Sequence, residues 1–310
     1  LTMPNYNGVW SLSTQYQNAA DWPRPASTAL FGGGDLGSNT MIDVIESINF
    51  NSQGNAVDFG NLSNIKRGGK SFSSSTRGVF AGGYDYTSST QTRHNQIEYV
   101  TISTAGNVTD FGDLTEGKYN GTGLSNSTRG IIAGGTNDSA KLNVIEYVTI
   151  ANTGNGTDFG DLSAAKQVLG GCASPTRGIF MGGDAASYIN VIEYITIGST
   201  GDVTDFGNLS ADTGYVASAS STTRGLMYGG RRGSSDVNTI EYITIASTGN
   251  ATDFGDRTVA SRTHSASSNS VFACGAGGFI SAASNVIDFV TIASTGNASD
   301  FGDLTAAKVG

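Results

Sequence analysis

Short apolar runs alternate with clusters of Gly, Ser, Thr and Asn along most of the chain. Val191 to Ile197 is β-branched and aromatic, with no Gly or Pro, which predicts a strand. Ile179 to Met181 is a second apolar run that stops at a Gly pair, and Val203 to Leu209 is a further short strand. Ser199 to Asp202 supply hairpin-turn residues before this last strand. No 3.6-residue periodicity is sustained, so we expect an all-β chain with helix content near zero.

This pattern occurs six times, and each copy carries the tripeptide Asp-Phe-Gly. A fixed spacing near 48 residues is typical of a solenoid, propeller or array. Four antiparallel strands in each unit, repeated six times, predict a six-bladed β-propeller. A residue shared by all copies is expected to be architectural, whereas a residue found in one copy is a candidate for function. The six phenylalanines are Phe59, Phe111, Phe159, Phe206, Phe254 and Phe301.

The ends of the chain bear on how the ring closes. The chain begins inside one blade and reaches Gly310 just as another first strand starts. Two interpretations remain open: the natural chain continues past Gly310, or residues 8–17 (Gly-Val-Trp-Ser-Leu-Ser-Thr-Gln-Tyr-Gln) fill the gap. We therefore divide the chain into residues 1–26, an attachment or blade-closing segment, and residues 27–310, the propeller.

The repeat resembles the kelch repeat. In each copy an apolar run ends in Gly-Gly, as at Gly182-Gly183, and a strand follows that bears a Tyr in four copies, as at Tyr194, and Ser47 or Phe289 in the outer two. The Phe of Asp-Phe-Gly stands where kelch repeats keep a Trp, and a basic residue comes a few positions later. The resemblance spans about residues 27 to 310 and implies a kelch-like propeller of four-stranded antiparallel blades. It implies no particular activity, because propellers host many functions. The basic residue is Lys66, Lys118, Lys166 and Lys308, with Thr213 in one copy.

Composition excludes several classes of partner. The chain has 17 Lys and Arg against 26 Asp and Glu, a net charge of −9. Nucleic-acid binding needs clustered basic residues, so we predict no nucleic-acid partner. No apolar run approaches the length of a membrane span, so we expect no membrane insertion. Cys172 and Cys274 fall in different parts of the repeat and are expected to be buried thiols rather than a disulfide.

An Arg and a Glu recur one strand apart in four copies. Adjacent strands place such residues within reach of each other, so we interpret them as ion pairs that fix the register of each blade. The alternative is a ring of acids that faces a ligand. The sixth copy has Phe272 and Asp288 at these positions, and the first has Thr28 with Glu46. The four pairs are Arg77 with Glu98, Arg129 with Glu146, Arg177 with Glu193, and Arg224 with Glu241.

Catalytic machinery is sparse in this sequence. The only histidines are His94 and His264, and no Ser-His-Asp arrangement can be assembled from the spacing. We expect both histidines to be surface or loop residues. The Asp-Phe-Gly-Asp turns are not spaced like a calcium loop, and an Asp at a turn usually caps its own backbone. We therefore predict no catalytic residue, no metal and no cofactor.

One loop varies between copies, the loop between the Gly pair and the Asn-x-Ile-Glu strand. Loops on one face of a rigid scaffold are the usual seat of recognition, and exposed Tyr and Arg are favoured in binding hot spots. The alternative is a surface loop that drifts without function. The predicted binding residues are Tyr84, Tyr86, Arg93, His94, Arg231, Arg232 and Phe279.

The amino-acid sequence of the repeat also resembles that of a class of proteins. The run from Ile240 to Asp256 (Ile-Glu-Tyr-Ile-Thr-Ile-Ala-Ser-Thr-Gly-Asn-Ala-Thr-Asp-Phe-Gly-Asp) looks like repeats in structural proteins of marine bacteriophages, cyanophages among them. Gly8 to Tyr16, followed by Trp22-Pro23, is similar to a segment that precedes receptor-binding domains in phage tail proteins.

These resemblances imply a non-enzymatic virion domain of a tail fibre or tail tip, at the particle surface. Its partners would be a host cell-surface glycan or protein and other virion proteins, and a homotrimer could come from segments outside this chain. Two alternatives remain: a structural decoration module without a receptor, and a carbohydrate-active enzyme on a propeller scaffold.

Overall fold

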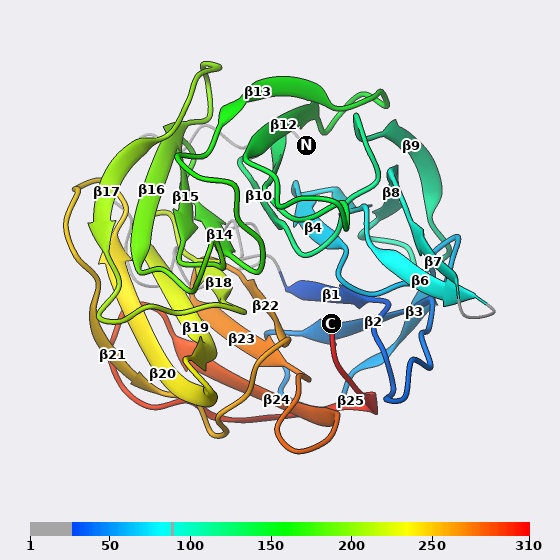
Figure 1. The fold of residues 1–310 in the computed structure, drawn as a ribbon. Helices are drawn as coiled ribbons and strands as arrows, with labels where there is room; N and C mark the ends of the chain where they lie inside the picture. The colour runs from blue at the N-terminus through cyan, green and yellow to red at the C-terminus, as the bar shows by residue number, and fades with distance from the viewer. Residues whose placement is uncertain (1–26, 88–89) are drawn as a thin grey trace, which may run out of the picture.

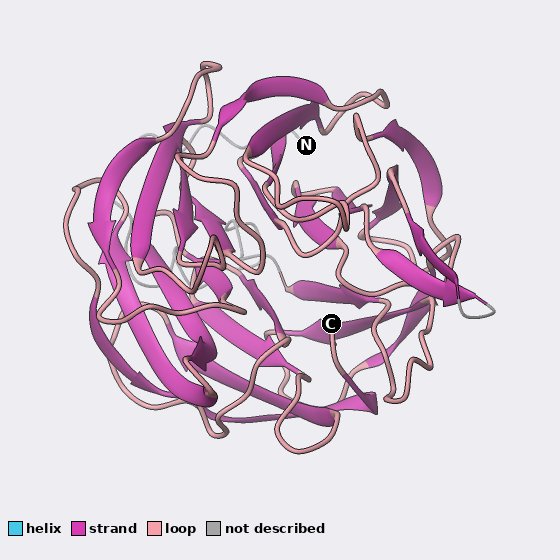
Figure 2. Ribbon diagram, in the orientation of Figure 1, coloured by secondary structure: helices cyan, strands magenta, loops and turns pink. Residues whose placement is uncertain are grey.

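The computed structural model describes residues 27–87 and 90–310, and in these ranges the chain forms strands and connecting loops with no helix (Figures 1 and 2). Six antiparallel sheets stand around a common axis as the blades of a β-propeller, as the repeat predicted. No helix in the described residues could cross a membrane.

Blade 1 is built from three strands, and blades 2 to 6 from four each. Blade 1 holds β1 (Thr28–Gly32), β2 (Val44–Asn49) and β3 (Val57–Asn61). Blade 2 holds β4 (Lys70–Ser73), β5 (Arg77–Ala81), β8 (Gln96–Thr101) and β9 (Thr109–Asp113), with the hairpin β6 (Tyr84–Thr87) and β7 (Thr90–Arg93) projecting from it. Blade 3 holds β10 (Thr122–Ser125), β11 (Arg129–Ala133), β12 (Val144–Thr149) and β13 (Thr157–Asp161). Blade 4 holds β14 (Gly170–Ala173), β15 (Arg177–Met181), β16 (Val191–Thr196) and β17 (Thr204–Asn208). Blade 5 holds β18 (Ala217–Ser220), β19 (Arg224–Arg232), β20 (Ser235–Thr244) and β21 (Thr252–Asp256). Blade 6 holds β22 (Ser265–Ser268), β23 (Phe272–Ala276), β24 (Ser284–Thr291) and β25 (Ser299–Lys308).

Asp-Phe-Gly joins each blade to the next. Phe111 is buried and meets Tyr99 of its own blade edge-to-face, with ring centroids 6.0 Å apart. Gly112 has φ +147°, and a Cβ there would lie 2.5 Å from the Gly154 carbonyl oxygen in the turn of blade 3. That turn is held because Gly154 N donates to the Phe111 carbonyl at 2.7 Å. The tripeptide is therefore a packing device of the fourth strand, and its Gly is required by a neighbouring backbone.

The predicted Arg–Glu pairs within blades are wrong. In the register of β5 and β8, Glu98 lies opposite Phe80 and Arg77 lies opposite Thr101. Side chains alternate between the two faces along a strand, so those of Arg77 and Glu98 point to opposite faces of the sheet. Arg77 instead lies over the Tyr99 ring, 4.3 Å from its centroid, and donates to the Ile150 carbonyl of the next blade at 2.8 Å. The other three pairs fail in the same way: Arg129, Arg177 and Arg224 stack on Tyr147, Tyr194 and Tyr242, not on Glu146, Glu193 and Glu241.

Blades 6 and 1 meet through the same kind of backbone contact that joins other neighbouring blades. Val309 and Asp35 exchange backbone hydrogen bonds of 2.9 and 2.8 Å, as Arg67 and Tyr84 do at 3.0 Å in the next junction. Among the described residues, blade 1 has no innermost strand beside β1, and a cavity of about 60 Å³ lies there next to Leu30, Ser71 and Ser265. Residues 8–17, which we considered for this position, lie outside the described residues, as does the whole segment 1–26.

The two cysteines are free and buried, as expected. Burial raises the pKa of both the Cys172 and the Cys274 thiol to about 12. Both are therefore neutral packing residues near neutral pH.

Candidate functional site

Each blade buries one carboxylate at its junction with the preceding blade, and a cation neutralises it. Lys66, in the connection that follows blade 1, places its Nζ 2.7 Å from Glu98 Oε2 of blade 2. Lys166 makes the same pair with Glu193 at 2.6 Å, and neither side chain is more than 2% exposed. Lys118 pairs with Glu146, and Lys308 lies 2.5 Å from Glu46 to close the ring. We call these carboxylates and their cations the junction belt.

At the fifth carboxylate the cation comes from elsewhere. Thr213 stands where the other connections have Lys, and Arg232 of the β19–β20 hairpin pairs with Glu241 instead. Arg232 Nε also donates to Thr213 Oγ1 at 3.1 Å, so the arginine covers the position that a lysine would have filled.

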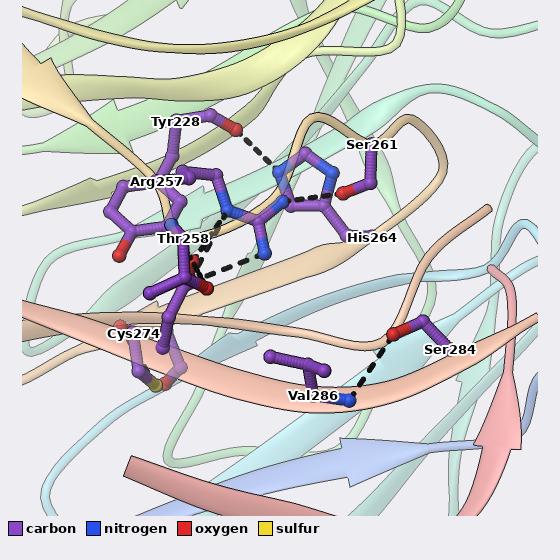
Figure 3. A network of polar contacts seen from close by, with 10 residues as sticks. Tyr228, Arg257, Thr258, Ser261, His264, Cys274, Ser284 and Val286 are labelled. Atoms are coloured by element: carbon purple, nitrogen blue, oxygen red, sulfur yellow. Dashed lines mark hydrogen bonds and ion pairs between the residues drawn. The ribbon is translucent and has the colours of Figure 1, made fainter. Parts of the chain in front are cut away.

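The sixth carboxylate is Asp288, which is one methylene shorter than Glu. Its partner is Arg257, which replaces the Leu of the other connections and lies 3.2 Å away with both side chains fully buried. Ser261 stands in the lysine position and accepts a 2.7 Å hydrogen bond from Arg257 Nη1 (Figure 3). Tyr228 lies beside the guanidinium, with its ring centroid 5.2 Å from Arg257 Cζ. All six acids are thus neutralised inside the ring, which argues against acids that face a ligand.

The variable loops and the connections between blades lie at the same end of the blades. Arg67 of one connection pairs through its backbone with Tyr84 of the β6–β7 hairpin, and Arg262 pairs likewise with Phe279. The same bridge joins Tyr119 to Thr136. We call this end the loop face.

Aromatic rings and arginines cluster in pairs on the loop face. Tyr84 packs on Tyr119 of the next connection with ring centroids 4.4 Å apart, and exposed Tyr86 meets Tyr84 edge-to-face at 5.7 Å. Across the ring, Tyr188 and Tyr215 lie 6.2 Å apart. Burial raises the pKa of Tyr84 and of Tyr188, and raises that of Tyr119 to about 12, so the phenols stay neutral. The Tyr84 hydroxyl accepts a hydrogen bond from Arg67 Nε, and the Tyr119 hydroxyl donates to Asp138, so both phenols help to hold the loop face in place.

A ring of backbone hydrogen bonds surrounds the axis at this face. Asn120 N donates to the Gly68 carbonyl at 2.9 Å, and Val168 N donates to Asn120 at 2.6 Å. Gly310 N donates to Thr263, and Gly68 N donates to Gly310 at 3.1 Å. Asn120, Val168 and Thr263 have positive φ between 51° and 57°, which is costly for β-branched residues. The chain accepts this strain at the mouth of the axis in order to link neighbouring blades.

Inside this ring lies an axial pocket of about 410 Å³, within the size range of small-molecule sites. Glycines, alanines and serines of the innermost strands line it, which keeps the axis open. Tyr84, Tyr215 and Phe279 contribute aromatic rings from the loop face, and Arg67, Lys70 and Arg262 contribute the positive charges. His264 also lines the pocket, but burial lowers its pKa well below the ordinary range, so the ring is neutral at pH 7.

The predicted binding residues divide into two groups. Tyr84 and Phe279 line the pocket, and Tyr86 is exposed beside Tyr84. Arg93, Arg231 and Arg232 are held within the protein: Arg93 pairs with Asp138 of blade 3 at 3.2 Å, Arg231 bonds to the carbonyls of its own hairpin, and Arg232 belongs to the junction belt.

Both histidines are loop residues, one of the two placements that we expected, but neither lies at the surface. Each is only 8% exposed. His94 Nε2 lies 2.9 Å from Asp85 Oδ2 inside the base of the hairpin, and His264 Nε2 bonds to the Tyr228 carbonyl. His94, predicted to bind a partner, thus holds the hairpin together.

Sequence reasoning missed the residues of the connections, although the sequence carries a sign of them. The position directly after that of the connection lysine holds five different residue types in the six copies, among otherwise similar neighbours: Arg67, Tyr119, Gln167, Gly214, Arg262 and Val309. Three positions further on, Lys70 corresponds to the small residues Thr122, Gly170, Ala217 and Ser265. Variation at a fixed repeat position would have identified both.

Among the described residues there is no cluster of three or more His, Cys, Asp or Glu side chains that would hold a metal ion. The structure therefore offers a loop face with aromatic rings, arginines and one axial pocket as its candidate site. No known family model matches the chain, and no curated protein is significantly similar to it in sequence.

Proposed function

We propose that this propeller is a non-enzymatic recognition module that binds a surface ligand through its loop face and axial pocket. The observation that carries the proposal is the concentration of repeat-breaking residues at one end of an otherwise regular scaffold. Lys70, Tyr84 and Phe279 each occur in one copy only, Arg67 and Arg262 occupy one repeat position in two of the six copies, and all five line one pocket. Binding sites on rigid scaffolds are built this way, with variation restricted to the loops.

The biological setting is proposed from the sequence. The repeat resembles kelch repeats and structural proteins of marine bacteriophages, so we place the module on a virion, in a tail fibre or tail tip that contacts the host surface. The ligand would be a host cell-surface glycan or protein.

The lining of the pocket favours binding over glycoside hydrolysis. Most glycosidases use two carboxyl groups that flank the scissile bond. The described residues that line the pocket include neither Asp nor Glu. The six buried carboxylates of the junction belt are already paired with cations and are not available as acid or base.

The proposal is tested by binding of the full chain to a glycan array and to surface-polysaccharide extracts of marine cyanobacteria. Replacing a hot-spot aromatic by Ala typically costs 2 kcal/mol or more, so we expect Tyr84→Ala and Phe279→Ala each to weaken binding about 30-fold. Val57→Ser is the matched control, because Val57 is 60% exposed and starts β3 at the opposite end of its blade.

Absence of binding to every extract and glycan would contradict recognition and favour a decoration module of the virion. Release of sugar from a polysaccharide by the wild-type chain would instead favour the enzyme.

A further inference from the structure

We propose that the axial pocket binds a sugar unit that carries a carboxylate, with the Lys70 ammonium as its anchor. This inference rests on the proposed recognition function and names the class of ligand that the same site would take.

The charge of the pocket wall is opposite to that of the protein. The chain carries a net charge of −9, yet the charged side chains that line the pocket are Arg67, Lys70 and Arg262. A cavity whose walls carry one sign of charge concentrates ligands of the opposite sign. The net negative charge of the protein disfavours polyanions, so a ligand with a single negative charge at one end suits this site better than a nucleic acid.

Of the three positively charged side chains that line the pocket, only one has no ion-pair partner among the described residues. Arg67 Nη1 lies 2.6 Å from Asp35 Oδ2, and Arg262 Nη1 lies 2.7 Å from Asp236 Oδ2, so both guanidinium groups are already neutralised and held in place. Lys70 Nζ makes no hydrogen bond or ion pair with any described residue. Its side chain is partly accessible through the pocket while protein surrounds it, and this burial lowers its pKa to about 8.

An ammonium in this position is incomplete without an anion. Burying a charge is costly unless it is paired, so the Lys70 ammonium is stabilised by a ligand that brings one negative charge. One unpaired cation matches a carboxylate, which carries one charge, better than a phosphate monoester, which carries nearly two.

The rest of the lining suits a sugar ring. Partly exposed Tyr215 presents a ring at the mouth, against which the C–H face of a pyranose can pack, while Tyr84 packs on Tyr119 and Phe279 lies under the Arg262 guanidinium. Deeper in the pocket, the hydroxyls of Ser71, Thr122 and Ser265 can exchange hydrogen bonds with sugar hydroxyls. The volume of about 410 Å³ has room for one or two sugar units.

The test is calorimetric titration of the full chain with glucuronic acid and galacturonic acid, with glucose, galactose and inorganic phosphate as comparison probes. Charge-assisted hydrogen bonds contribute about 1.5 to 3 kcal/mol, so we expect a uronic acid to bind at least tenfold more tightly than its neutral counterpart at pH 7. We expect this preference to disappear as the pH rises from 7 to 9.5, because Lys70 loses its proton near pH 8.

Two variants and a control assign the effect to the pocket. Lys70→Met should abolish the preference for the acid, and Ser265→Glu should do so while keeping Lys70. Lys141→Met should leave it unchanged, since Lys141 also lies on the loop face but pairs with Asp184 outside the pocket.

Equal binding of acid and neutral sugar, or a preference that survives Lys70→Met, would overturn the proposal. Tighter binding of phosphate than of either uronic acid would overturn it in favour of a phosphate site. If host extracts bind the loop face but Lys70→Met has no effect on any probe, recognition stands and only the ligand class fails. If no extract binds, recognition itself fails.

Discussion

Lys66 and Lys70 are four residues apart and occupy opposite environments. Lys66 is buried in the junction belt and lies 2.7 Å from Glu98, while Lys70 lines the axial pocket without a charged partner among the described residues. The first position is basic in most repeats, whereas the second is a small residue in every other blade that has an innermost strand. The difference separates two uses of one residue type. A lysine with a carboxylate repeated beside it holds the ring together, and a lysine without one is free to meet a ligand.

Removal of a cation from the junction belt should cause the largest loss of stability. Lys166→Met leaves Glu193 as an uncompensated buried charge, and the free energy of unfolding should fall by about 3 to 5 kcal/mol. Chemical denaturation measures this loss. Adding Glu193→Leu should recover most of it, since an apolar pair replaces the ion pair; a double variant as unstable as the single one would contradict the assignment.

The Gly of Asp-Phe-Gly should be the next most sensitive element. Gly112→Ala places a Cβ 2.5 Å from the Gly154 carbonyl oxygen at φ +147°, and we expect a loss of about 2 to 4 kcal/mol. Gly154→Ala is the matched control, because its Cβ would meet nothing within 4 Å. Equal stability of the two variants would show that the close approach between blades is not limiting.

At the fifth junction, a lysine at position 213 should be able to replace Arg232 as the partner of Glu241. Arg232→Ser alone should destabilise the protein by about 2 kcal/mol or more, because Glu241 loses its partner. Adding Thr213→Lys restores the arrangement of the other junctions and should recover the stability in thermal unfolding. If the lysine gave no rescue, the belt would depend on more than one cation for each carboxylate.

Lys70→Met should have the smallest effect and the opposite sign. Removal of an unpaired, partly buried charge should raise stability at pH 7 by about 1 kcal/mol. The folded protein loses the Lys70 proton near pH 8, below the ordinary value of 10.5, so the unfolded chain binds more protons between these values. Wild-type stability should therefore gain on that of the variant as pH rises through this window. Parallel pH profiles of the two proteins would contradict an isolated ammonium.

Much of the fold could be predicted from the sequence because the same pattern of strands and turns occurs in six repeats. The main strands of the blades were recognisable from apolar runs and turn residues, whereas β6 and β7 lie in a segment that we predicted as a loop. The Phe of Asp-Phe-Gly is buried as its position implied. The partner of Glu98 could not be read in this way. Neighbouring strands suggested Arg77, but the pleat sends the two side chains to opposite faces, and the true partner comes from the preceding repeat.

Only part of the candidate site could be predicted from the sequence, for a related reason. The long hairpin drew attention to Tyr84 and His94 through its length, whereas Arg67 and Lys70 lie in segments of normal length. Which of these side chains meet around one axis depends on ring closure, a long-range property that local patterns do not contain. His94 and Arg232 looked like binding residues, but both satisfy buried carboxylates inside the scaffold.

The source of each cation also constrains how the gene for this chain can change. Near-identical tandem repeats invite unequal crossing-over, which removes or adds whole units. Loss of the unit that spans 67–118 or 119–166 would keep a lysine before the next Glu and would leave the later junctions unchanged, so the charges would still match. Loss of unit 214–261 would place Thr213 before Asp288 and leave that carboxylate without Arg257. The junction charges of the early blades are therefore interchangeable, while those of the late blades require a fixed order that recombination cannot alter without leaving a carboxylate unpaired.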